Sequence, residues 1–127
     1  MSGTRPIVIR ASEAPAPPGP ATAGMDRREL AQEHDTWVGW VRTDPGAGGW
    51  HHHGDYDSYI YLISGSITIE FGPGGRERVT ATAGDFVLNP SGVVHREITE
   101  GDTPAELFVV RRGTGPQNVN VDGPDTD

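Results

Sequence analysis

The chain contains no cysteine among its 127 residues. A disulfide framework, a thiolate metal site and a thiol nucleophile are therefore excluded, and any metal ion must be bound through nitrogen or oxygen ligands. Long apolar runs are also missing, since the longest near the N-terminus covers only residues 7–9. Such a run is too short for a signal peptide or a membrane span, so we expect a cytoplasmic location and no membrane partner.

Positive charge is scarce. Ten Lys and Arg residues stand against 18 Asp and Glu residues, and the formal net charge is −8. Nucleic-acid binding depends on clustered Lys and Arg, so we expect no nucleic-acid partner. An acidic surface favours solubility and identifies no substrate.

Turn-forming residues are abundant, with 18 glycines and 11 prolines. They leave little room for long helices, and from residue 36 onward short stretches rich in Val, Ile and aromatic residues alternate with turn signals. These stretches predict an all-β sandwich or barrel. The expected strands are 36–43, 59–63, 66–71, 77–83, 86–88, 93–99 and 105–112.

The two ends differ from this central region. Residues 1–24 combine a β-prone patch, Ile7–Ile9, with a proline-rich stretch, which predicts an arm and linker. Residues 25–34 fit either a short helix or a polar edge strand. Residues 114–127 are acidic and predict a loosely held tail with room for a short strand at 118–121. One barrel domain is therefore expected over residues 25–113.

Three histidines fit one metal site. His51 and His53 occupy alternate positions, so on an extended strand their side chains share a face, while His52 points the other way. His95 follows a Pro-Ser-Gly turn on a separate strand, which a closed sheet can bring opposite the first two. Three neutral imidazoles can bind one divalent ion. The alternative is that the three consecutive histidines form a polar surface loop.

Two motifs give these histidines a context. The first has the order Gly, His-x-His, Glu, Gly, and here His51 and His53 are followed after four residues by Ser58 and after six more by Gly65, with Gly46 one position away from the usual first glycine. The second has the order Gly, Pro-x-Gly, His, Asn. The corresponding residues here, at matching spacing, are Gly84, Pro90, Gly92, His95 and Thr99.

Residues 46–99 therefore resemble the cupin superfamily, in the small single-domain form. The resemblance implies a jelly-roll β-barrel with six to ten antiparallel strands and little or no helix. It also implies one divalent metal ion bound by His51, His53 and His95. Iron(II) is the expected metal, with zinc, nickel or manganese as alternatives.

The sequence departs from the family pattern at two positions. Ser58 stands where the motif has its glutamate ligand, and Thr99 stands where it has asparagine. Three neutral imidazoles leave the full charge on the metal, which favours an anionic or enolizable ligand. Cupins with only the three histidines resemble thiol dioxygenases and diketone-cleaving dioxygenases, which are iron(II) enzymes. We therefore expect an iron(II) oxygenase acting on a small chelating organic molecule.

Two other functions remain open. A non-redox isomerase, lyase or cyclase can use the same site, with the metal polarising a carbonyl. A non-catalytic cupin that binds a small molecule is the third alternative, because fold does not fix function.

Two carboxylates are candidates for the site. Asp57 becomes a fourth ligand if the turn after His53 shifts by one residue; otherwise it is a turn aspartate that caps backbone groups. Glu97 alternates with His95 and Thr99, so a regular strand turns all three inward. An inward Glu97 is a candidate for catalytic proton transfer. The alternative is that a local twist leaves it in solvent beside Arg96.

Strand alternation also predicts a mostly apolar substrate pocket. Its expected lining is Ser58, Ile60, Leu62, Phe86, Leu88 and Thr99. A homodimer is expected because small cupins pair through sheet edges, and Ile7–Ile9 is the strand that such a pair would exchange.

Overall fold

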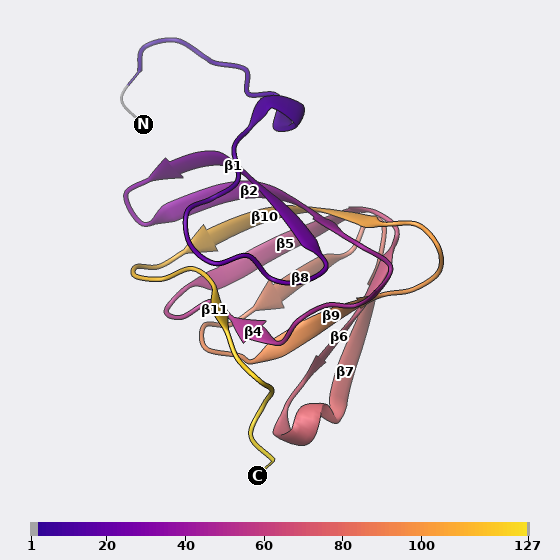
Figure 1. Cartoon of the computed structure of the whole chain (residues 1–127). Coiled ribbons are helices and arrows are strands. Elements are labelled where there is room, and N and C mark those ends of the chain that lie inside the picture. The colour runs from indigo at the N-terminus through magenta and orange to yellow at the C-terminus, as the bar shows by residue number, and fades with distance from the viewer. Residues whose placement is uncertain (1–2, 127) are drawn as a thin grey trace.

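The computed structural model describes residues 3–126 and consists of two facing antiparallel β-sheets (Figure 1). Helical structure among these residues is confined to two 3-10 turns, η1 (Ala11–Glu13) and η2 (Pro73–Gly75). The prediction of an all-β cupin-type barrel with little helix is confirmed. No helix of the described residues is long and apolar enough to cross a membrane.

The first sheet, sheet A, contains five strands. Their spatial order is β1 (Met25–Glu33), β2 (Thr36–Thr43), β10 (Ala105–Arg112), β5 (Asp57–Ser64) and β8 (Phe86–Asn89). Residues 25–33 of the undecided segment are therefore a strand that pairs with β2, with one register shift between Glu29 and Ala31. The turn between β1 and β2 contains His34, with a φ of 53°.

The second sheet, sheet B, contains six strands. The order is β11 (Val119–Asn120), β4 (His51–His52), β9 (His95–Thr99), β6 (Ser66–Phe71) and β7 (Glu77–Thr82), and β3 (Gly46–Ala47) pairs with the far end of β9. The short strand expected within 118–121 is present as β11. Of the eleven strands in the described residues, three have only two residues each. The number of longer strands, eight, lies within the expected range of six to ten strands.

The core lies between the sheets and follows the alternation of the strands. Inward residues of β10 alternate with exposed ones, and they pack with Trp37, Leu62 and Ile67, whose side chains are fully buried. Trp37 lies across Gly39 on the same strand. A Cβ at Gly39 would be 1.9 Å from the indole, so only glycine leaves room for this ring.

One end of the barrel interior is polar instead of apolar. In sheet A the inward residues at this end lie side by side in the order Trp37, Arg111, Ser58 and Asn89. In sheet B, His51 lies directly across from His95. The fold therefore positions polar side chains on both sheets at this end of the barrel: Arg111, Ser58 and Asn89 beside Trp37 on sheet A, and His51 and His95 on sheet B.

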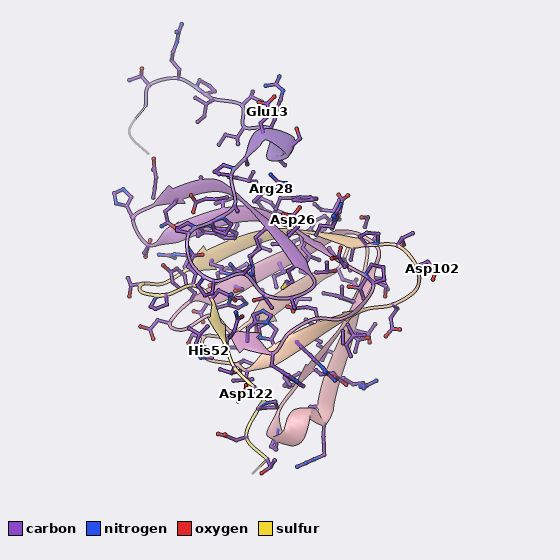
Figure 2. The ribbon with its side chains drawn as sticks, viewed as in Figure 1. Glu13, Asp26, Arg28, His52, Asp102 and Asp122 are labelled. Carbon is purple, nitrogen blue, oxygen red and sulfur yellow. The ribbon has the colours of Figure 1, made fainter. Side chains whose placement is uncertain are left out.

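The terminal segments differ in their attachment. The arm extends away from the barrel (Figure 1), and Ile7 and Val8 in it are exposed. Further along, the Thr22 hydroxyl hydrogen-bonds with Asn118 and Asn120, so the segment before β1 is held against the segment around β11. Acidic side chains such as Asp102 and Asp122 lie on the surface (Figure 2).

Candidate metal centre

The three predicted histidines come together in the barrel interior. His51 belongs to β4, His53 follows its end, and His95 begins β9. One ring nitrogen from each lies within 4.8 Å of the others, and all three side chains are buried. The prediction that these residues form one cluster is confirmed.

Backbone carbonyls orient all three rings. A carbonyl only accepts hydrogen bonds, so each Nδ1 carries the proton and donates it. This leaves the lone pair on each Nε2 free to bind a metal ion. The bonds are His51 Nδ1 to Gly49 O at 2.8 Å, His53 Nδ1 to Gln117 O at 2.8 Å and His95 Nδ1 to Val93 O at 2.9 Å.

Burial keeps two of the rings neutral. It lowers the pKa of His51 to about 4 and holds the pKa of His53 well below its usual value, to which the nearby Arg111 cation contributes. Metal ions bind the neutral imidazole, so at neutral pH these two ligands need not lose a proton first.

Glu97 points into the same space. Its Oε1 lies 3.1 Å from His95 Nε2, and its Oε2 lies 3.8 Å from His51 Nε2. Of the two orientations that the sequence left open, the structure shows the inward one, and the Glu97 side chain is buried. The carboxylate adjoins the cluster on the side of these two histidines.

A carboxylate oxygen and an unprotonated Nε2 are both acceptors, so a cation must lie between them. Without a metal this cation is a proton: burial would lower the pKa of His95, but Glu97 outweighs it and the pKa is raised. Burial would likewise raise the pKa of Glu97, but His95 and His51 lower it well below its usual range.

The donor set fits a divalent metal ion. Three nitrogen ligands lie close enough together to hold one ion, a carboxylate adjoins two of them, and no sulfur ligand is present. Two of these atoms, His51 Nε2 and Glu97 Oε2, are buried without a hydrogen-bond partner. An unsatisfied buried polar atom is costly, and an ion held by the three histidines would satisfy His51 Nε2 and lie beside the Glu97 oxygen.

Comparison with known families agrees with this geometry. Residues 39–111, more than half of the chain, match the cupin domain family. The chain is a cupin. No curated protein matches it.

Solved structures similar to this cupin share its fold. The polyketide cyclase RemF from Streptomyces resistomycificus is 18% identical, with a TM-score of 0.73 over 92% of this chain and 86% of that one. A double-stranded β-helix protein from Klebsiella pneumoniae is 19% identical, with a TM-score of 0.70 over 92% and 98%. A predicted oxalate decarboxylase from Thermotoga maritima is 22% identical, with a TM-score of 0.67 over 85% and 100%.

Ser58, which stands at the glutamate position of the cupin motif, has a different partner in the structure. Ser58 faces inward from β5, but its hydroxyl accepts a hydrogen bond from Arg111 Nε at 3.3 Å. A carboxylate enters the centre from β9 instead, through Glu97. A carboxylate therefore adjoins the three histidines, although Ser58 stands at the glutamate position of the motif.

Asp57 is not placed to be a fourth ligand. It is exposed, and its Oδ1 accepts a hydrogen bond from the Ser91 backbone N–H at 2.9 Å. Alternation places it on the opposite face of β5 from Ser58. The alternative reading, a turn aspartate that caps backbone groups, is the correct one.

Four of the six predicted pocket residues face the interior of the cupin barrel. Ser58 belongs to the polar row, Ile60 and Leu62 belong to the apolar core, and Thr99 hydrogen-bonds with Thr43 at 2.7 Å. Their inward direction is as expected, and their role as the lining of a substrate pocket stays a prediction.

Phe86 and Leu88 were assigned to the wrong face of β8. Their side chains are 74% and 70% exposed. The pairing of β8 with β5 aligns Asn89 with Ser58 and Val87 with Ile60, so Asn89 and Val87 take the inward positions.

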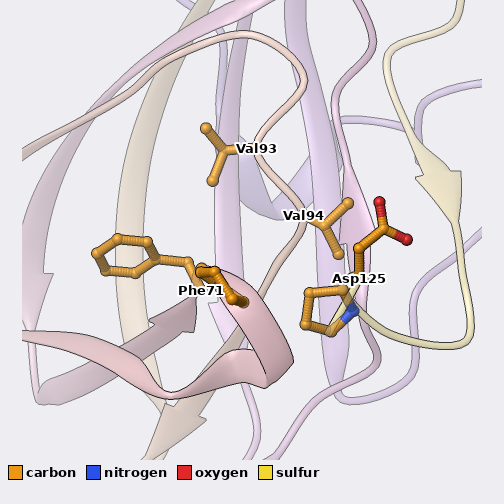
Figure 3. A pocket seen from close by; sticks show the side chains of 7 residues that line it. Phe71, Val93, Val94 and Asp125 are labelled. Atoms are coloured by element: carbon orange, nitrogen blue, oxygen red, sulfur yellow. The ribbon is translucent and has the colours of Figure 1, made fainter. Parts of the chain in front are cut away.

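Two apolar hollows lie near the centre. One of about 270 Å³ is lined by Ile69, Val79, Val87, Leu88, Asn89 and neighbouring residues. Asn89 connects it to the centre, since its Nδ2 lies 3.5 Å from His95 Nε2. The other, of about 320 Å³, lies between Phe71, Val93, Val94 and the C-terminal segment (Figure 3) and contains no histidine. The smaller hollow is the better candidate for substrate access.

The sequence interpretation missed three inward polar residues: Arg27, Asn89 and Arg111. The inward direction of Arg111 could have been predicted from strand alternation, because Leu107 and Val109 precede it on the same, buried face of β10. Asn89 likewise lies two residues after Val87, on the same inward face of β8. Nothing in the sequence marked Arg27, since the type of its segment was undecided.

Proposed function

We propose that this cupin is a metal-dependent enzyme that moves a proton on a small chelating molecule, as an isomerase, lyase or cyclase does. The observation that supports it is the buried Glu97 carboxylate, which has an unpartnered oxygen beside three metal-ready Nε2 atoms. A carboxylate fixed next to a bound substrate is suited to general-base catalysis.

The residues have separate roles in this proposal. His51, His53 and His95 would hold one divalent ion, for which zinc, nickel and manganese are the candidates. When bound, the ion supplies a Lewis acid that polarises a carbonyl group. Glu97 accepts the proton at Oε2, and the apolar hollow beside Asn89 excludes water from the reacting molecule.

The test uses Glu97→Gln, which keeps the shape of the side chain and removes its basicity. Protein loaded with zinc, nickel or manganese would be incubated in D₂O under nitrogen with a panel of 2-oxo acids and 1,3-dicarbonyls. We expect the wild type to catalyse exchange of the protons next to the carbonyl, measured by NMR. The variant should be slower by about 10²- to 10⁴-fold.

Glu106→Gln is the matched control, because Glu106 is a partly exposed carboxylate on β10, away from the interior. It should retain the wild-type rate. Equal rates for the wild type and Glu97→Gln would contradict the base role. Full affinity for the same molecules without metal would indicate a non-catalytic binding protein.

An iron(II) oxygenase is the second candidate. The observation in its favour is that three histidines form one side of the centre, which suits iron(II) and would leave coordination positions open for substrate and oxygen. Oxygen uptake by the iron(II)-loaded protein, in proportion to substrate consumed, would support it. Full turnover under nitrogen would exclude it.

We also propose that the protein is a homodimer. The outer face of sheet A is unusually apolar, with Tyr59, Phe86, Leu88 and Phe108 exposed. They are neighbours in register, since Phe86 lies across from Tyr61 and Leu88 across from Tyr59. Contiguous exposed apolar patches mark interaction surfaces, and a second copy presents the same patch.

Phe86→Asp is expected to convert this dimer to a monomer, because it places a charge on a surface that dimerisation would remove from water. Size-exclusion chromatography with light scattering gives the mass. Val79→Asp, which adds the same charge at an exposed position on sheet B, should remain dimeric. A monomeric wild type would contradict the proposal.

A further inference from the structure

Two arginines are buried close to the metal centre. Arg27 and Arg111 are only 6% and 4% exposed. A buried cation is costly unless an anion accompanies it. Within residues 3–126, no carboxylate lies within ion-pair distance of either guanidinium.

Arg111 is held rigidly but incompletely paired. It extends from the inner face of β10, and its guanidinium carbon lies 4.8 Å from the centre of the Trp37 ring. Its Nε donates to Ser58 Oγ, which is its one hydrogen bond within the described chain. The two Nη groups therefore remain available, and a planar guanidinium fixed in this way can bind a carboxylate through two parallel hydrogen bonds.

Arg27 lies on the neighbouring edge of sheet A. Its Nη2 donates to Thr22 Oγ1 at 3.0 Å and to Asn118 Oδ1 at 3.1 Å, both neutral acceptors. Its Nε is buried with no partner. A second cation thus has an unsatisfied donor in the same interior.

The two arginines and the centre influence each other electrostatically. Burial, with a smaller contribution from the Arg27 cation, lowers the pKa of Arg111 to about 9, and Glu97 opposes this. Burial also lowers the pKa of Arg27, again opposed by Glu97. One carboxylate thus faces two guanidiniums, and a divalent ion would add further positive charge.

We infer that Arg111, assisted by Arg27, binds a carboxylate group of the substrate. This inference rests on the proposed function, and it specifies the substrate class as a small organic acid whose other oxygen binds the metal ion. An anion entering here would neutralise the interior and pair with the free Nη groups of Arg111. Ser58 supports this arrangement, since the glutamate of the usual motif at this position would pair with Arg111 itself.

The probe for the test is malonate, with malonamide as its neutral isostere. Cobalt(II)-loaded protein would be titrated with each, using calorimetry and the visible absorption of cobalt. We expect malonate to bind the wild type and malonamide to bind at least about 10-fold more weakly. Arg111→Gln should weaken malonate binding by at least about 10-fold, equivalent to about 1.4 kcal/mol, and leave malonamide binding unchanged.

Arg112→Gln is the matched control, because the next residue points outward and pairs with Asp35 on the surface. It should bind malonate as the wild type does. Arg111→Lys keeps the charge but loses the planar fork, and an affinity between those of the wild type and Arg111→Gln is expected. Arg27→Gln should also weaken malonate binding, and it provides a second variant if Arg111→Gln fails to fold.

The outcomes separate this inference from the proposed function. Unchanged malonate affinity in folded Arg111→Gln and Arg27→Gln, both with full cobalt content, would overturn the carboxylate site and leave the metal centre intact. Equal binding of malonate and malonamide by the wild type would also overturn it. A wild type that fails to bind cobalt would instead contradict the metal-dependent function on which the inference rests.

Discussion

His95→Ala is expected to leave the purified protein without its metal ion. His95 supplies one of three Nε2 ligands and also holds the contact with Glu97 Oε1. Removal of a hydrogen-bonding partner outside the ligand set already costs about 10- to 100-fold in metal affinity, so loss of a ligand should cost more than about 100-fold. Elemental analysis after dialysis against micromolar metal should find close to one ion per wild-type chain and almost none in the variant.

His52→Ala is the control from the same histidine tract. His52 points away from the centre, and its Nδ1 accepts a hydrogen bond from the Gly54 backbone N–H at 3.0 Å. We expect its metal content to match the wild type. Unchanged metal content in His95→Ala would contradict the three-histidine assignment.

Leu62→Ala is expected to destabilise the folded protein by about 3 to 4 kcal/mol. Leu62 is fully buried in the core between the sheets, so truncation loses the transfer free energy of the side chain and leaves a cavity. The total free energy of unfolding of a domain is about 5 to 15 kcal/mol, so this is a large fraction of it. Urea unfolding followed by tryptophan fluorescence measures the difference.

Ile63→Ala provides the comparison on the next residue of β5. Ile63 points to the opposite face and is 44% exposed, so its loss should cost less than about 1 kcal/mol. Equal destabilisation by the two changes would show that the faces of β5 are wrongly assigned.

The histidine cluster was predictable because it depends on short-range geometry. Alternate residues of an extended segment share a face, so His51 and His53 were expected to point the same way. The position of His95 could not be predicted from local geometry, since only the closure of the sheets places it opposite His51. The motif spacing supplied that information.

The face of β8 was not predictable from its residues. Phe86, Val87 and Leu88 are all apolar, so hydrophobicity alone does not decide which of them points inward. The register with β5 decides it, and the residue it turns inward at the end of the strand is the polar Asn89. The rule that apolar side chains face the core fails here because the outer face of sheet A is also apolar.

The partners of Glu97 and Arg111 could not be predicted from the sequence either. Alternation places both inward, but the sequence does not say what a buried charge would meet there. For Glu97 the answer is His95 and His51, which lie on strands of the same sheet. For Arg111 it is Trp37 and Ser58, from the two strands that flank β10.

The position of β10 in the middle of sheet A has a consequence for how the chain folds. It pairs with β2 on one side and β5 on the other, so the sheet is completed only when a late segment inserts between two early ones. Loop-closure entropy must be overcome before such distant pairings stabilise the chain, which makes folding slow for the size of the domain. Until β10 inserts, the edges of β2 and β5 stay unpaired and open to intermolecular association, and the row that includes Trp37, Arg111 and Ser58 does not exist.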